Sequence, residues 1–234
     1  MEAALRATLS PLGQRVQQPA AFLPLQTAQA RGKRFNATIG QITDGHGKAV
    51  PLPTMEAVLS DLSEEERSRA FLYSPVEGLA DLRSARHGRP LVTLGAAQAL
   101  AILGDLFVME GRIVVAPSSL HDLFHVRLGG DCRTGFDNLP EGEPVFAVGG
   151  TRDELLKAAE RGPVVAVVDE LFWEHENLVP IRVEEFEEVG FLTFPFPPDS
   201  PLADEMEKKA KMLLRAQIGS PPAITQVMAL RKLA

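Results

Sequence analysis

Apolar residues along the chain form short continuous runs that alternate with longer stretches of helical spacing. The short runs, bounded by glycine, proline or aspartate, predict strands at residues 90–93, 112–116, 144–148, 164–168, 178–183 and 189–194. The longer stretches predict helices at residues 76–86, 96–109, 118–126, 152–161 and 202–215, with a last helix from about Pro222. Strands of this kind, separated by helices, are typical of a parallel sheet covered on both faces. The pattern therefore predicts an α/β fold, a three-layer α/β/α sandwich with a mostly parallel sheet.

The sequence divides into an amino-terminal arm and one large domain. Residues 1–30 mix alanine, glutamine and proline with little periodicity, and we interpret residues 1–34 as an arm. Residues 35–234 form the large domain, which ends in C-terminal helices. A length of 234 residues suits one large domain or two small ones.

Composition and charge exclude several classes of protein. Acidic residues number 31 and basic residues 24, so the net charge of −7 provides no basic surface for nucleic acid or an anionic membrane. A single cysteine, Cys132, excludes a disulfide framework and a cysteine-rich zinc site. The longest weakly polar run, residues 91–104, is shorter than a membrane span, and the N-terminus lacks the apolar core of a secretory signal. We expect a soluble, cytoplasmic protein.

Three segments carry motifs in a fixed order: Phe-Asn-Ala-Thr-Ile-Gly at 35–40, Tyr-Ser-Pro-Val-Glu-Gly-Leu at 73–79 with Leu82-Arg83, and Thr-Leu-Gly-Ala-Ala-Gln-Ala-Leu at 93–100. They resemble the N-terminal arm, the Tyr-x-Pro-x-x-Gly segment and the first phosphate-binding turn of the class I/II aminotransferases, the fold-type I enzymes that use pyridoxal phosphate. Residues 164–168 followed by Asp169 resemble the strand whose terminal aspartate pairs with the pyridine nitrogen of that cofactor. Val-Gly-Phe-Leu at 189–192 is similar to the segment after the family's lysine loop. The resemblance implies the fold of the family's large domain from about residue 35 onward.

The resemblance also implies catalytic parts that this sequence lacks. A lysine must hold the cofactor as a Schiff base, and the family places it between the segments that match Asp169 and Gly190 here. This stretch contains no lysine, and the acidic run Glu-Glu-Phe-Glu-Glu at 184–188, which would repel a phosphate, stands in its place. The family's Asn-Pro-x-Gly turn is replaced by residues 148–151, and its small domain, with the arginine for the substrate carboxylate, is absent. We therefore expect no covalently bound pyridoxal phosphate.

Five residues are the candidates for a relict cofactor site: Gly95, Ala96, Ala97, Tyr73 and Asp169. The first three stand at a strand-to-helix turn whose backbone N–H groups either cradle a phosphate or serve close packing alone. In the family, the tyrosine that matches Tyr73 reaches the partner's phosphate across the dimer; otherwise this side chain is an interface or core aromatic. Asp169 is either a partner for a pyridinium or a helix N-cap.

The carboxyl ends of the predicted strands collect residues 95–97, 117–119, 149–151 and Asp169 at one edge of the sheet. Three of these segments offer N–H groups at a helix start, so a small anion such as sulfate is the ligand they could accept. Thr151 followed by Glu154 also predicts a capping box. The acidic run works against an anion if it folds over this edge, and we expect the cleft to be vacant or filled with water.

Other chemistry-bearing residues have ordinary structural explanations. His121 and His125 share one helix face, as metal ligands can, and His175 is the only further candidate, but we predict no metal. Cys132 has no adjacent base, so we expect no nucleophilic role for its thiol. We interpret residues 184–188 as a solvated acidic turn.

Two hypotheses of function follow. In the first, the chain is a non-catalytic binding or interaction paralogue of the aminotransferases that keeps their homodimer, with residues 20–40 and the neighbourhood of Tyr73 at the interface. In the alternative, it is an active pyridoxal-phosphate-dependent aminotransferase that uses a displaced lysine or a partner subunit. All seven lysines are expected to lie on arms, loops or helices remote from the expected site: Lys33, Lys48, Lys157, Lys208, Lys209, Lys211 and Lys232.

Overall fold

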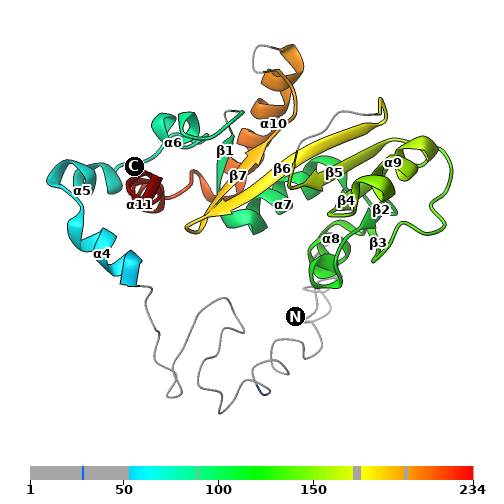
Figure 1. Ribbon diagram of the computed structural model, residues 1–234, viewed down its shortest axis with the longest axis horizontal. Coiled ribbons are helices and arrows are strands. Elements are labelled where there is room, and N and C mark those ends of the chain that lie inside the picture. The colour runs from blue at the N-terminus through cyan, green and yellow to red at the C-terminus, as the bar shows by residue number, and fades with distance from the viewer. Residues whose placement is uncertain (1–27, 29–52, 89, 171–174, 198–199, 234) are drawn as a thin grey trace, which may run out of the picture. The chain divides into compact units, whose positions relative to one another are not determined.

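The computed structural model describes residues 28, 53–88, 90–170, 175–197 and 200–233 (Figure 1). The chain divides into two compact units, and the described residues from Glu66 onward belong to one of them. Helix α4 (Pro53–Asp61) belongs to the other unit, which spans residues 17–65. The predicted arm at 1–34 and the motif at 35–40 lie outside the described residues, apart from residue 28.

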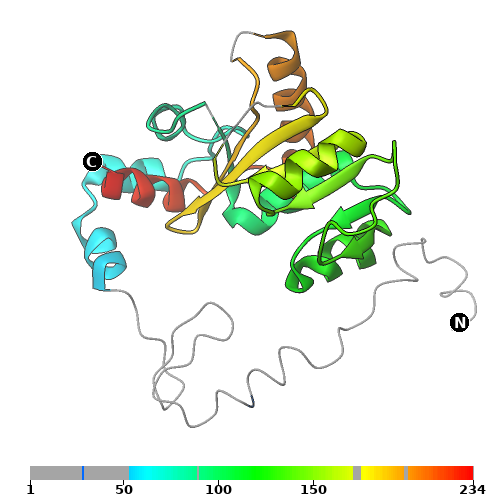
Figure 2. The ribbon, with the colours of Figure 1, turned by 45° about the vertical axis from the view of Figure 1, so that its right-hand side comes forward.

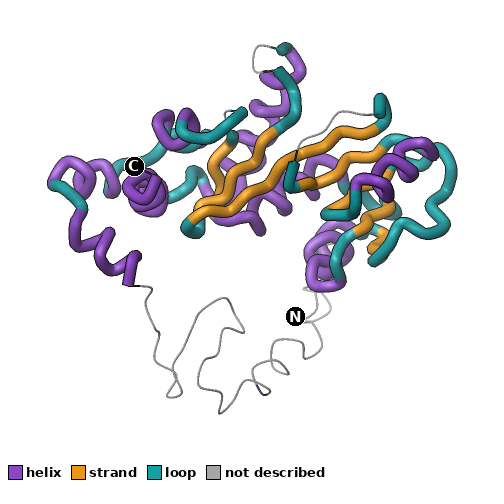
Figure 3. Tube along the Cα trace, in the orientation of Figure 1, coloured by secondary structure: helices purple, strands orange, loops and turns teal. Residues whose placement is uncertain are grey.

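A seven-stranded sheet forms the centre of the larger unit, in the order β1-β7-β6-β5-β4-β2-β3. Strand β7 is antiparallel to both of its neighbours, whereas the other adjacent pairs are parallel. Figure 3 shows the strands of this sheet in orange. The mostly parallel sheet predicted from the apolar runs is therefore confirmed. The strands are β1 (Leu91–Leu94), β2 (Ile113–Val115), β3 (Asp131–Arg133), β4 (Val145–Val148), β5 (Val164–Val168), β6 (Leu178–Phe186) and β7 (Val189–Thr193).

Helices pack on both faces of this sheet, as Figure 2 shows for α9 on one side and α7 on the other. Side chains alternate along each strand, so Phe146 of β4 joins the apolar core with α7, α8 and α10, while Val145 and Ala147 join the core with α9. The three-layer arrangement is thus confirmed. The described helices that lie wholly in this unit are α6 (Ala80–Ser84), α7 (Gly95–Phe107), α8 (His121–Leu128) after a 3₁₀ turn at Ser118–Leu120, α9 (Arg152–Arg161), α10 (Pro201–Ile218) and α11 (Ala223–Leu233). Helix α5 (Glu64–Ala70) begins two residues before the boundary between the units.

The helix predicted at 76–86 is wrong in its first half, because Gly78 interrupts it. Gly78 has a φ of +97°, and a Cβ there would lie 2.3 Å from Cγ2 of Val92. Only glycine combines that backbone conformation with so close an approach to β1, so α6 begins two residues later, at Ala80.

Residues 73–79 are held against α11 by one buried amide. The Gln226 side chain is fully buried; its Oε1 accepts a hydrogen bond from the Leu79 N–H at 2.7 Å. Its Nε2 donates to the Pro221 carbonyl at 3.1 Å and to Ser74 Oγ at 3.2 Å. The chain's C-terminal helix therefore fixes the Tyr-x-Pro-x-x-Gly segment.

Among the described helices, none combines the length and the apolar character that crossing a membrane requires.

Candidate functional site

The carboxyl ends of β2, β4 and β5 form the wall of an open pocket of about 430 Å³. Parallel strands end at the same edge of a sheet, so the loops that follow them converge there. The structure accordingly brings together Pro117, Gly149, Gly150 and Asp169, as expected from the sequence. The pocket is lined by Pro117, Val148, Gly149, Gly150, Arg152, Val167, Val168, Asp169 and Glu170.

The turn at Gly95–Ala97 does not line that pocket, because β7 and β6 lie between β1 and β5 in the sheet. Gly95 adopts a φ of +69° and begins α7 directly after β1. The Ala96 N–H donates a hydrogen bond to Oε2 of Glu185 at 2.7 Å. The Leu94 N–H donates to Oε1 of Gln98, also at 2.7 Å. Two N–H groups at this helix start are therefore already bonded within the chain.

The acidic run at 184–188 is only in part the solvated turn predicted from the sequence, since Glu187 and Glu188 form a turn and Glu185 and Glu188 are exposed. Strand β6 extends through Phe186, and three of the four carboxylates have partners. Oε2 of Glu184 lies 2.5 Å from Nη2 of Arg182, Glu185 accepts the Ala96 N–H, and Oε1 of Glu187 lies 2.7 Å from Nζ of Lys232. The sequence pattern missed these roles because each partner except Arg182 comes from a distant element.

Lys232 is a residue of α11, and its Nζ meets Glu187 at the β6–β7 turn. Figures 1 and 2 show this end of the β6–β7 hairpin next to α11. The expectation that every lysine lies remote from this region is therefore wrong for Lys232. The turn itself consists of Glu187 and Glu188, both with positive φ, at +52° and +64°. A two-residue turn of this type is favoured by asparagine and glycine, so the two glutamates are held there at a conformational cost.

The amino terminus of α9 carries the predicted capping box, which is confirmed. Oγ1 of Thr151 accepts the Glu154 N–H at 3.3 Å, and Oε2 of Glu154 accepts the Thr151 N–H at 2.8 Å. The hydrogen bonds from the Thr151 backbone and hydroxyl lower the pKa of the Glu154 carboxyl below its ordinary value. N–H groups expected to be available to an anion at 149–151 are thus partly used by the helix's own cap.

Tyr73 and Asp169 occupy different surfaces. Tyr73 is 75% exposed and lies beside Gly219 at the end of α10, where its hydroxyl would be 3.3 Å from a Cβ added to that glycine. Asp169 is exposed at the rim of the pocket beyond β5. Its predicted helix N-cap role concerns residues 171–174, which lie outside the described residues.

The histidines and the cysteine serve the fold. Nε2 of His121 donates to the Ala116 carbonyl at 3.0 Å, and Nδ1 of His125 donates to the Gly130 carbonyl at 2.9 Å. No group of three potential metal ligands occurs among the residues that the structure describes. Burial, followed by the nearby charges of Asp131 and Asp122, raises the pKa of the Cys132 thiol to about 11, so it is a poor nucleophile at neutral pH.

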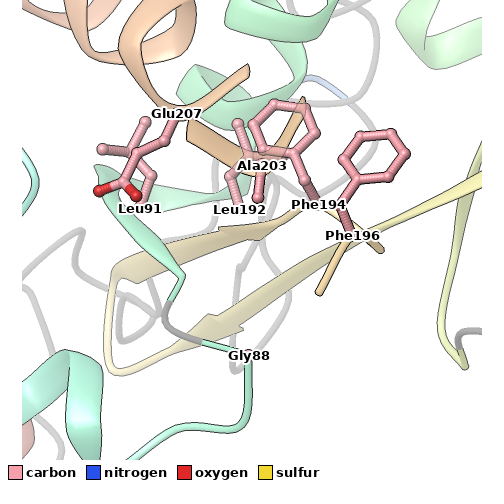
Figure 4. Close-up of a pocket in the computed structure, with 7 residues that line it drawn as sticks. All are labelled: Gly88, Leu91, Leu192, Phe194, Phe196, Ala203 and Glu207. Carbon is pink, nitrogen blue, oxygen red and sulfur yellow. The ribbon is translucent and has the colours of Figure 1, made fainter. Parts of the chain in front are cut away.

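A second, small pocket lies toward the opposite end of β1 and β7 (Figure 4). It holds about 30 Å³, the volume of a single water molecule. Phe194 and Phe196 lie on its β7 side, and Glu207 of α10 binds Arg83 at 2.7 Å next to it. A space of this size accommodates no cofactor or metabolite.

Comparison with known proteins gives a fold and no closer relationship. No protein-family model matches the sequence, and a search of curated proteins finds no match. Among solved structures, the broad specificity aminotransferase from Leishmania mexicana aligns with 100% of this chain and 75% of its own, with a TM-score of 0.64 and 14% identity. The chain has an aminotransferase fold.

Two further structures agree with that assignment. The multiple substrate aminotransferase from Thermococcus profundus aligns with 98% of this chain and 71% of its own, at a TM-score of 0.65 and 13% identity. A double mutant of Thermus thermophilus aspartate aminotransferase aligns with 97% and 72%, at a TM-score of 0.62 and 15% identity. At such identities the likeness establishes the fold, and the activity has to be argued from this chain's own residues.

Proposed function

We propose that this protein is a non-catalytic binding or interaction protein built on the aminotransferase fold. The main support for this proposal is that β6 and β7 are joined by only two residues, Glu187 and Glu188. This short turn stands where the resemblance implies the loop that carries the Schiff-base lysine. The sequence contains no lysine between Asp169 and Lys208. A Schiff base with pyridoxal phosphate requires an amine at the reacting carbon, and this part of the chain supplies none.

The side chains at the β1–α7 turn also fit the cofactor's phosphate poorly. Ala96 and Ala97 offer no hydroxyl, and the Ala96 N–H already has a carboxylate as its acceptor. The carboxylate of Glu185 places negative charge next to the Ala96 N–H, which disfavours a dianionic ester.

We infer that the protein acts as a homodimer. Phe71, Leu72 and Tyr73 are consecutive and are 85%, 65% and 75% exposed, respectively. Three large apolar side chains in a row are unusual on a free surface and mark an interaction site. Ile218, 39% exposed, precedes the glycine beside Tyr73 and extends this surface. The predicted contribution of residues 20–40 falls almost entirely outside the described residues.

The dimer is tested by light scattering of the wild-type protein and of a Phe71→Ser, Tyr73→Ser double variant. We expect a dimer of about 51 kDa for the wild type, twice the 25.4 kDa chain, and a monomer for the variant, because such interfaces depend on a few buried aromatics. Leu202→Ser, which removes a 46% exposed side chain on α10, is the control and should remain a dimer. A wild-type monomer at micromolar concentration contradicts the inference.

We expect the open pocket to be vacant or filled with water, and the ligand that it could accept is a small molecule, or a small anion near Arg152. A volume of about 430 Å³ lies within the range of small-molecule sites. We place the protein in the cytoplasm, where its single thiol stays reduced, and the net charge of −7 disfavours nucleic acid as a partner.

The alternative function is a working pyridoxal-phosphate enzyme with a displaced lysine or a partner subunit. Lys232 is the observation that favours it, because its ammonium reaches the β6–β7 turn from α11 while its side chain is only 16% exposed. In this case Lys232 would be the amine that reacts with the cofactor.

One experiment separates the two functions. The purified protein is incubated with pyridoxal phosphate, its absorbance is recorded at about 400–430 nm, where an internal aldimine absorbs, and borohydride reduction is followed by peptide mass spectrometry. We expect no band and no pyridoxyl-lysine. An adduct at Lys232 that disappears in Lys232→Met, but persists in Lys209→Met, would establish the alternative.

A further inference from the structure

We propose that Glu185 acts as a built-in anion that closes the amino terminus of α7, so that dissolved phosphate and phosphate esters are kept out of this helix end. Its Oε2 accepts the Ala96 N–H at 2.7 Å, at the position where an external anion would bind. The contact joins residues 89 apart in the sequence. A carboxylate at a helix start gains from both the hydrogen bond and the helix dipole.

The sheet register places Glu185 at this helix end. Glu185 is paired with Gly190 of β7, and Gly190 is paired with Thr93 of β1, two residues before the start of α7. A Cβ at position 190 would lie 2.2 Å from Oγ1 of Thr93 and 2.3 Å from the Gly95 carbonyl oxygen. Because glycine leaves this space to the β1–α7 turn, that turn lies directly against β7 and within reach of Glu185.

The same hairpin is fixed by contacts on either side of Glu185. Arg182 pairs with Glu184 within β6, and Lys232 of α11 pairs with Glu187 at the turn. Lys232 and Glu187 are only 16% and 24% exposed, so their ion pair is partly shielded from water and helps to hold the turn, while Glu185 itself lies at the surface. A carboxylate held in this way competes with dissolved phosphate for the Ala96 N–H. Because it is part of the same chain, its effective concentration at that N–H is on the order of millimolar or higher.

Closure of α7 does not depend on whether any lysine carries a cofactor. Non-covalent phosphate binding at Ala96 would overturn the closure of α7 and would leave open whether a lysine forms a Schiff base. A pyridoxyl adduct at Lys232 would overturn the proposed non-catalytic function and would leave the contact between Glu185 and Ala96 unaffected. The two proposals therefore fail separately.

The test is a titration of ¹⁵N-labelled protein with inorganic phosphate, followed through the amide signals of Ala96 and Ala97. Each point is matched by potassium chloride of equal ionic strength, because surface potentials change with salt. We expect no specific shift in the wild type. We expect saturable shifts at both amides in Glu185→Ala, where the N–H group is released.

Glu188→Gln is the matched control, since it removes one negative charge from the neighbouring turn and leaves the Ala96 contact in place. It should behave as the wild type does. Glu185→Gln keeps an acceptor oxygen without the charge and should give weaker saturable shifts; it also serves if the alanine variant does not fold. Saturable shifts of equal size in the wild type and Glu185→Ala overturn the proposal. The absence of phosphate-specific shifts in both Glu185 variants also overturns it.

A second readout is the melting temperature. Glu185→Ala should lower Tm by about 1–4 °C, the amount expected for loss of one charged contact at a helix start in a chain of this size. Saturating phosphate should restore part of that loss in Glu185→Ala and leave the Tm of Glu188→Gln unchanged. A Glu185→Ala variant as stable as the wild type contradicts a closing role for this carboxylate.

Discussion

Two parts of the same sheet edge differ in what their loops do. Beyond β4 and β5 the chain leaves an open pocket, with glycines and valines at its wall and Arg152 and Asp169 at its rim. Where β1 and β6 end and β7 begins, the chain closes on itself, because Glu185 caps α7 and Lys232 holds the turn. The difference shows that one fold can keep a binding surface at one place and convert the adjacent place into internal structure.

The closed part depends on a close approach of backbones, whereas the open part depends on a loop conformation. Gly190 leaves no room for a Cβ, and Gly149, with a φ of +82°, has no atom within 4 Å of where a Cβ would stand. Substitution at the first position should disturb packing across β1 and β7. Substitution at the second should cost only the strain of a positive φ.

The largest expected effect therefore comes from Gly190→Ala. It should destabilise the protein by about 3 kcal/mol, because the new methyl group meets backbone atoms that cannot turn aside, and should lower Tm by roughly 6–12 °C. Gly149→Ala is the control and should cost about 1–2 kcal/mol. Thermal and urea unfolding measure both. Equal losses at the two positions would remove the distinction between the closed and open parts.

Loss of the ion pair at the turn should have the next largest effect. Lys232→Met keeps the aliphatic stem and leaves Glu187 without its ammonium partner, so we expect a loss of about 1–2 kcal/mol for this partly buried pair. Lys209→Met removes an exposed pair with Glu205, 3.4 Å apart, and should change stability little. Hydrogen exchange should be faster at Ala96 in the first variant alone. An unchanged exchange rate at Ala96 in Lys232→Met would show that the ion pair at the turn does not support the contact between Glu185 and Ala96.

At the open part, the capping box provides a smaller test. Thr151→Ala should lower Tm by about 2–4 °C through the loss of the α9 cap. The pKa of Glu154 is lowered in the folded state, so its contribution to stability is present above its ordinary pKa of 4.5 and is lost as pH falls through the folded value. The Tm difference between the wild type and Glu154→Gln should accordingly be constant at neutral pH and shrink below pH 4.5. A difference that grows on acidification would contradict the box.

The smallest effect concerns Cys132 on the edge strand β3. With a thiol pKa of about 11, it should react with iodoacetamide at pH 7.5 more slowly than free cysteine. Mass spectrometry of timed aliquots measures the rate, and the guanidinium-unfolded protein is the control. A folded protein that reacts faster than the unfolded one would indicate an activated thiol.

The sequence by itself determined the layers of this protein. Local pattern predicts strands β4 and β5 from the continuous apolar runs at 145–148 and 164–168. It also predicts helices α7 and α9 from the spacing of their apolar residues, because both signals involve only residues that are a few positions apart. The capping box of Thr151 and Glu154 is equally local, since it spans three residues. The missing lysine is a property of the sequence alone.

Tertiary structure decided the rest, because the deciding contacts join distant residues. The short β3 could not be predicted from a three-residue run that contains two charges, and it exists because β2 offers it a partner. Gly78, with its positive φ, lies directly against Val92 of β1, and the helix predicted from residue 76 begins only at Ala80. Ala96 finds Glu185 through the register of three strands, and Lys232 reaches Glu187 from the last helix. A helix start that local sequence left open to an anion is closed by a carboxylate whose position is fixed by pairing across the sheet.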